Sequence, residues 1–217
     1  MGIDRTRYLD ADEAERLRTV AHARAVLDAA AGRKRGPLLW ALVDTALVTG
    51  LRVSELARLV VGDLDARRGM LRVWRHKRRK RLQESMAISP TLAAHLSEFV
   101  AWKASAGQPV DPDSPLFWGK RGPLGAQGLA QAWRTAIRLA GLPRGLSIHC
   151  ARHTAAVQLL GACNNLRAVQ KHLGHASPTT TANMYADVPF KKMQEAVAGM
   201  YAPAGAEKKS AAAQDLS

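Results

Sequence analysis

The chain has 217 residues and carries 32 Lys and Arg against 18 Asp and Glu, a formal net charge of +14. Its two cysteines exclude a disulfide scaffold and fit a reducing cytosol, and no run of about 20 apolar residues predicts a membrane span. A protein this basic usually has a polyanionic partner, and nucleic acid is the default. The alternative is a basic surface without function.

The first quarter of the chain is predicted to be helical. Residues 10–31 have a helical apolar spacing, and Asp10 begins a capping box. A second helix is expected from Pro37 to Gly50, with an apolar face wide enough to predict burial. A short helix over 54–59 follows.

The hydrophobic period changes at residue 70. Met70–Trp74 alternates as a strand does, and a second strand is expected over Glu84–Ile88. Between them lies a hairpin tip made almost entirely of Lys and Arg. Such a tip can enter a nucleic-acid groove, or it can be a solvated loop that makes only nonspecific phosphate contacts.

The rest of the chain again favours helix, apart from a Gly-, Pro- and Asp-rich loop over 105–125. The fold class is therefore mainly α with a small antiparallel β-hairpin. We expect one domain over 1–201 and a disordered tail over 202–217. The further expected helices are 90–104, 126–140, 149–160 ended by Gly161, 165–173 ended by Gly174, 177–188 and 190–200.

The first candidate for chemistry is Arg52, which directly follows the helix-ending Gly50 and Leu51. Its planar guanidinium matches two phosphate oxygens, and Glu55 three residues later can hold it in place. The plain alternative is a surface ion pair.

The second candidate is the pair His149 and Arg152, which share a helix face at a spacing of three. With His153, His172 and His175, these histidines raise the possibility of zinc. A fixed arginine cation among the ligands argues against a divalent metal. An Arg and a His suit a phosphodiester better, one for charge and the other for protons.

Tyr185 stands ten residues after His175. Alone it would be a core or interface residue. Together with two Arg, a Lys and two His, it can act as the nucleophile on a phosphodiester. No acidic pair for magnesium accompanies these residues, so we expect no metal and no other cofactor.

These residues resemble the catalytic domain of the tyrosine recombinases, the lambda-integrase and Xer-like phage integrase family. The resemblance covers residues from about 8 to 190 and rests on four strings in the same order and spacing. They are Thr-Gly-Leu-Arg-Val-Ser-Glu-Leu (49–56), Ser-Ile-His-Cys-Ala-Arg-His-Thr (147–154), Leu-Gly-His-Ala-Ser (173–177) and Thr-Thr-x-x-x-Tyr (180–185).

The resemblance implies a role for each matching residue. Arg52 and Arg152 would clamp the scissile phosphate, with Glu55 supporting Arg52. Tyr185 would attack the phosphate, giving a 3′-phosphotyrosyl link and a free 5′-hydroxyl. Rejoining would then need no ATP.

Lys77 would protonate the leaving hydroxyl, with Lys80 in reserve because the hairpin is crowded. His149 would be the general acid/base, and His175 would hydrogen-bond the phosphate. The hairpin residues expected to contact DNA are Arg75, His76, Arg78, Arg79, Lys80 and Arg81.

The resemblance further implies recombination or integration of double-stranded DNA in the cytoplasm, at the nucleoid. The protein is expected to be a monomer off DNA. On two paired DNA sites it would be a homotetramer, joined through a C-terminal segment over about 189–200. Members of the family usually carry an N-terminal helical domain, whereas this sequence starts almost at the catalytic domain, so we expect either a minimal enzyme or a fragment.

Three alternatives remain. A DNA-binding regulator could use 46–59 as a helix-turn-helix without catalysis. A type IB topoisomerase-like enzyme would use the same chemistry and let strands rotate. A degenerate recombinase would bind DNA and cleave poorly. Cys150, where the family often has an acidic or polar residue, need not affect catalysis.

Overall fold

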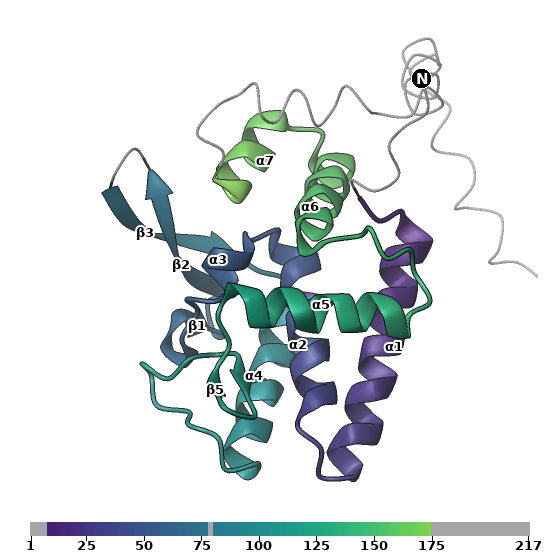
Figure 1. Cartoon of the computed structure of the whole chain (residues 1–217). Coiled ribbons are helices and arrows are strands. Elements are labelled where there is room, and N and C mark those ends of the chain that lie inside the picture. Colours follow the sequence, from purple (N-terminus) through teal and green to yellow (C-terminus); the bar gives the residue numbers. More distant parts are fainter. Residues whose placement is uncertain (1–7, 78–79, 175–217) are drawn as a thin grey trace, which may run out of the picture. The chain divides into compact units, whose positions relative to one another are not determined.

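Helices α1 (Ala11–Ala30) and α2 (Arg35–Thr49) form a helical hairpin in the computed structural model, which describes residues 8–77 and 80–174 (Figure 1). The predicted capping box is confirmed at the start of α1. The Asp10 carboxylate accepts from the Glu13 N–H at 2.8 Å, and the Glu13 carboxylate accepts from the Asp10 N–H at 3.1 Å. All described residues fall in the unit Met1–Thr181 of a chain that divides at that point.

Helix α2 is the centre of the core. Nearly all of its residues are buried, as its wide apolar face predicted. It contacts α1, α4 (Pro90–Ser105), α5 (Ala126–Leu139) and α6 (Ile148–Cys163). Figure 1 shows α5 crossing the α1–α2 pair, with α6 and α7 (Leu166–Leu173) at the end where α2 stops.

The sheets are small and antiparallel, so the predicted fold class is confirmed. The first sheet has the order β1 (Leu64–Asp65), β2 (Met70–Lys77) and β3 (Lys80–Ala87). Strands β2 and β3 pair from Met70 opposite Ala87 to Lys77 opposite Lys80, so they reach much further toward the tip than predicted. A second sheet pairs β4 (Trp118–Gly119) with β5 (Gly122–Pro123).

Two helix ends differ from the prediction. Helix α6 passes through Gly161 and ends at Cys163, because Asn164 supplies the left-handed backbone of the cap, with φ of 47°. Helix α3 (Val53–Leu56) has only four residues, and a 3₁₀ turn (Val61–Asp63) follows it. The helices expected over 177–188 and 190–200 and the expected tail lie outside the described residues. Among the described residues, no helix is long and apolar enough to cross a bilayer.

Lys103 ties α4 to the loop that follows it. Its side chain is fully buried, and its Nζ donates to the main-chain oxygens of Pro115 at 2.7 Å and Leu116 at 3.0 Å. Burial lowers the pKa of Lys103 from 10.5 to about 8.

This pKa shift makes folding stability depend on pH. Between pH 8 and 10.5 the unfolded chain binds more protons at Lys103 than the folded chain, so stability rises with pH across this window. From pH 8 to pH 10.5, the free energy of unfolding of the wild type should rise by about 3 kcal/mol relative to that of a Lys103→Met variant at the same pH. Urea titrations of both proteins at several pH values measure the difference, and parallel pH profiles would contradict it.

Candidate active site

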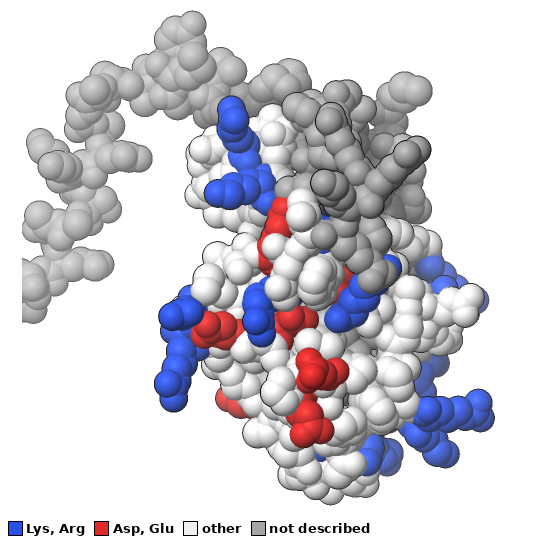
Figure 2. All heavy atoms as spheres, turned by 90° about the vertical axis from the view of Figure 1, so that its left-hand side faces the viewer, with Lys and Arg blue, Asp and Glu red and all other residues white. Residues whose placement is uncertain are grey.

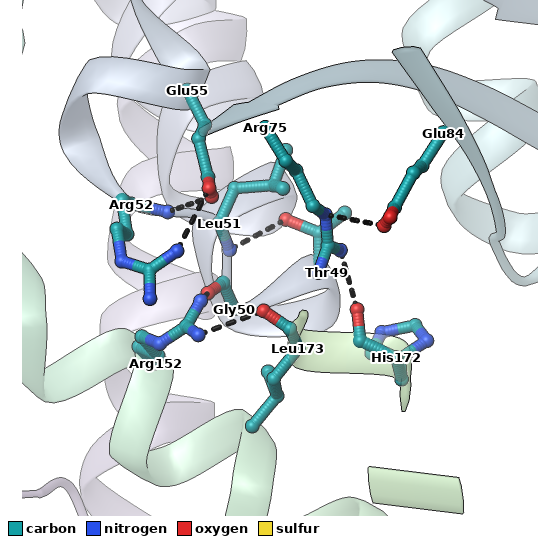
Figure 3. Close-up of polar contacts among 10 residues, drawn as sticks. All are labelled: Thr49, Gly50, Leu51, Arg52, Glu55, Arg75, Glu84, Arg152, His172 and Leu173. Carbon is teal, nitrogen blue, oxygen red and sulfur yellow. Dashed lines mark hydrogen bonds and ion pairs between the residues drawn. The ribbon is translucent and has the colours of Figure 1, made fainter. Parts of the chain in front are cut away.

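Arg52 and Glu55 are placed by the sharp junction between α2 and α3. Helix α2 ends at Gly50, whose φ of 61° is left-handed, and Arg52 is the N-cap of α3 (Figure 3). Glu55 accepts from the Arg52 main-chain N–H at 2.8 Å and from its Nη1 at 3.0 Å. The Glu55 side chain is 4 % exposed and that of Arg52 is 42 % exposed. The pair is therefore a buried carboxylate that holds a half-exposed guanidinium, rather than a wholly solvated surface pair.

Arg152 lies in the first turns of α6 and donates hydrogen bonds to the ends of two other helices, α2 and α7. It is 7 % exposed, and its Nη1 and Nη2 donate to the main-chain oxygens of Gly50 and Leu173, each at 2.7 Å. These bonds hold the ends of α2 and α7 beside α6. Burial and the nearby Arg52 guanidinium lower the pKa of Arg152 to about 10, so it stays cationic at neutral pH.

Arg75 is not where the sequence placed it. We expected a DNA-contacting side chain on the basic hairpin, but Arg75 is 2 % exposed. Strand alternation gives the reason, since Leu71 and Val73 on the same face of β2 are also buried. Its Nη2 donates to the main-chain oxygen of His172 at 2.5 Å, and its Nε lies 3.5 Å from Glu84 Oε2 (Figure 3).

Near the tip of the hairpin, the residues on either side of the turn are described by their backbone only. Lys77 pairs with Lys80 in the register of β2 and β3, and His76 pairs with Arg81. Paired positions lie on the same sheet face, so the register does not separate Lys77 from Lys80 as the catalytic lysine. The remaining predicted site residues that lie outside the described residues are Arg78, Arg79, His175 and Tyr185.

His149 lies in the first turn of α6, exposed and three residues before Arg152, as expected. Within residues 8–77 and 80–174, no three His, Cys, Asp or Glu side chains are close enough to hold a metal. His172, which the sequence marked only as a possible zinc ligand, instead gives its main-chain oxygen to Arg75. Burial and the Arg75 guanidinium lower the pKa of His172.

The three guanidinium groups of Arg52, Arg75 and Arg152 are close enough to influence one another. Burial lowers the pKa of Arg75 and Arg152, and the charge of Arg52 lowers both further. Glu55 opposes this shift at both arginines, and Glu84 opposes it at Arg75. A cluster of three cations and two carboxylates favours an anion, and preorganised arginine donors can stabilise charge on a phosphate during reaction.

The junction at Gly50 leaves no room for a side chain. A Cβ there would lie 2.6 Å from Leu173 Cδ2 and 3.0 Å from Ala155 Cβ. Gly32 has a similar φ of 66° with nothing within 4 Å, so Gly32→Ala is the matched control. We expect Gly32→Ala to cost about 1 kcal/mol of stability from backbone strain alone. Gly50→Ala should cost about 1–3 kcal/mol more, from overpacking, and equal losses in chemical denaturation would contradict the crowding.

Comparison with known proteins places this site in a family. The family model described as the phage integrase family matches residues 7–192. A tyrosine recombinase XerC of Pelotomaculum thermopropionicum is 33 % identical over 158 residues, which are 71 % of this chain and 51 % of that protein. XerC of Chromohalobacter salexigens is 36 % identical, over 72 % and 50 %. XerD of Mycobacterium leprae is 31 % identical over 190 residues, 84 % and 60 %. The chain thus spans about half the length of the curated relatives that it matches.

Solved structures give the same answer for the fold. A XerA recombinase superposes with a TM-score of 0.72 at 24 % identity, over 93 % of this chain and 64 % of that one. XerH bound to difH substrate in a pre-cleavage complex gives 0.64 at 22 % identity, over 87 % and 52 %. Because the family model covers most of the sequence, this protein belongs to the phage integrase family of tyrosine recombinases.

Proposed function

We propose that this chain is a site-specific recombinase that cleaves and rejoins DNA strands through a covalent tyrosine intermediate. The observation that carries the proposal is the convergence of Arg52 and Arg152. Residues a hundred positions apart in sequence meet at Gly50, with Glu55 holding one guanidinium and two main-chain oxygens holding the other. Relatives named as recombinases support the same reading.

In the proposed reaction, the Tyr185 hydroxyl attacks the scissile phosphorus and the bond to the 5′ oxygen breaks. The phenolic proton passes to His149, and Lys77 donates a proton to the leaving 5′ oxygen. Arg52, Arg152 and His175 stabilise the negative charge on the phosphate. The phosphotyrosyl ester replaces the phosphodiester, so the reverse attack by a 5′-hydroxyl rejoins a strand without ATP or a cofactor.

Double-stranded DNA is the proposed partner, and solved relatives bound to DNA support it. The face that includes the hairpin shows acidic side chains among the basic ones (Figure 2). We assign DNA contact to the hairpin tip, through His76, Arg78, Arg79, Lys80 and Arg81. A homotetramer on paired sites through 189–200, a single domain over 1–201 and a cytoplasmic, nucleoid-associated location complete the proposal.

The regulator hypothesis is weaker because of the length of α3. A recognition helix that enters the major groove needs several turns, but α3 has four residues and ends in the buried Leu56. A topoisomerase-like activity would share the chemistry and differ only in strand rotation.

The test is a trapping assay with nicked suicide DNA, quenched with detergent, in buffer containing EDTA. A covalent protein–DNA complex is expected. Salt-sensitive binding without any covalent complex would favour a non-catalytic binder. Relaxation of plasmid without a specific site would favour the topoisomerase-like alternative.

A further inference from the structure

Two arginines from different elements hold the C-terminal end of α7. Arg152 on α6 donates to the Leu173 oxygen at 2.7 Å, and Arg75 on β2 donates to the His172 oxygen at 2.5 Å (Figure 3). The last carbonyls of a helix have no partner within the helix and carry partial negative charge. Two cations on consecutive carbonyls therefore fix both the position and the direction of this end.

Arg75 is enclosed at this point. Within the described residues its Nη1 is buried without a hydrogen-bond partner, and its Nε is buried with only the 3.5 Å ion-pair contact to Glu84. Gly174, with φ of 66°, packs directly against the guanidinium, and a Cβ at this position would lie 1.5 Å from Arg75 Nη1. DNA cannot reach this side chain in the described conformation, so its role differs from the DNA contact proposed for the tip residues.

The location of Arg75 links two parts of the site. It lies two residues before Lys77 on β2, and the carbonyl that it holds is three residues before His175. Leu173, between that carbonyl and Gly174, is the partner of Arg152. A movement of the C-terminal end of α7 would therefore displace the Leu173 carbonyl that holds Arg152. It would also displace Gly174, the residue directly before His175 in the sequence.

We propose that Arg75 is a positioning residue that fixes the hairpin strand to the C-terminal end of α7 and so sets the geometry of Arg152. The expected effect on catalysis rests on the proposed function, whereas the positioning of the α7 end by Arg75 does not. Arg75 does not touch the substrate. It acts through the His172 carbonyl and its contact with Gly174, on either side of the Leu173 carbonyl that Arg152 holds.

The first test compares the wild type with Arg75→Met and Arg75→Lys. Hydrogen exchange of the α7 amides in the free protein measures positioning. Covalent-complex formation at saturating suicide DNA measures the chemical step, and a separate titration measures DNA affinity. Arg75→Met should speed exchange at the end of α7 at least tenfold and slow covalent-complex formation at least tenfold. DNA affinity and its salt dependence should change less than threefold. Arg75→Lys should recover part of both losses, since an ammonium can still donate to the His172 oxygen.

A second variant displaces the Arg75 side chain without replacing the residue. Gly174→Ala would displace the guanidinium, whereas Gly141 has φ of 64° and nothing within 4 Å, so Gly141→Ala controls for backbone strain. Gly174→Ala should reproduce the Arg75→Met losses and Gly141→Ala should not. In the Arg75→Met background, Gly174→Ala should add no more than the backbone strain that Gly141→Ala measures, because the clash and the Arg75 substitution act on one contact.

The outcomes separate the two proposals. Faster α7 exchange in a protein that forms no covalent complex would support positioning and reject the proposed function. Unchanged α7 exchange in Arg75→Met, or additive Gly174→Ala and Arg75→Met effects, would overturn positioning while the recombinase function stands. Weaker DNA binding with a reduced salt dependence would instead make Arg75 a phosphate contact and also overturn the proposal. If Arg75→Met does not fold, the Gly174→Ala and Gly141→Ala pair decides.

Discussion

Replacing Tyr185 with phenylalanine is expected to abolish the covalent protein–DNA complex and to leave DNA affinity within about twofold of the wild type. The variant lacks only the hydroxyl oxygen, which is the proposed nucleophile, so no phosphotyrosyl bond can form. Arginine and lysine contacts to phosphate supply most of the affinity for DNA and are unchanged. Detergent-quenched gels measure the complex, and a binding titration at fixed salt measures affinity.

The chain offers matched controls, because it has three tyrosines. Tyr8→Phe and Tyr201→Phe remove the same atom elsewhere and should both keep the covalent complex. Persistence of the complex in Tyr185→Phe, together with its loss in either control, would move the nucleophile to another tyrosine. Loss in all three variants would point to a general effect on folding instead.

The sequence predicted the helical framework well where local signals were strong. The capping box at Asp10 and the cap at Gly174 are both in the structure. Gly161 misled the prediction, because a glycine inside a helix is tolerated, and Asn164 three residues later takes the left-handed backbone. The strand β1 was missed because two residues carry no period, and only pairing with β2 defines it.

Sequence reasoning brought out three residues of the candidate site that the structure places together, but not their contacts. Motif spacing identified Arg52, Glu55 and Arg152, and the structure brings these three together. The motif spacing could not show that Arg152 donates to the Gly50 and Leu173 oxygens, because main-chain acceptors do not depend on residue type. Arg75 was misassigned for a related reason. Its basic neighbours marked the hairpin, whereas strand alternation, read from Leu71 and Val73, indicates the buried face.

Arg152→Ala should slow covalent-complex formation by about 10²–10³-fold, the usual effect of removing one donor to a developing oxyanion. The change should also destabilise the fold, because it leaves the buried carbonyls of Gly50 and Leu173 without donors. At about 1–3 kcal/mol for each of the two unsatisfied groups, a loss of roughly 2–6 kcal/mol is expected. Urea denaturation measures this loss, and the cleavage rate must be taken where the variant is fully folded.

Arg52→Ala separates chemistry from folding. The Arg52 side chain is 42 % exposed and its only described side-chain partner is Glu55, so its removal should cost less stability than that of Arg152. The loss of cleavage should nevertheless be of the same order, because both guanidinium groups are assigned to one phosphate. If Arg52→Ala cleaves at a near-normal rate while Arg152→Ala is slow only in proportion to its unfolded fraction, then Arg152 supports the fold and the two-arginine clamp is wrong. Slow cleavage by a stable Arg52→Ala protein would leave the phosphate as the shared target of both residues.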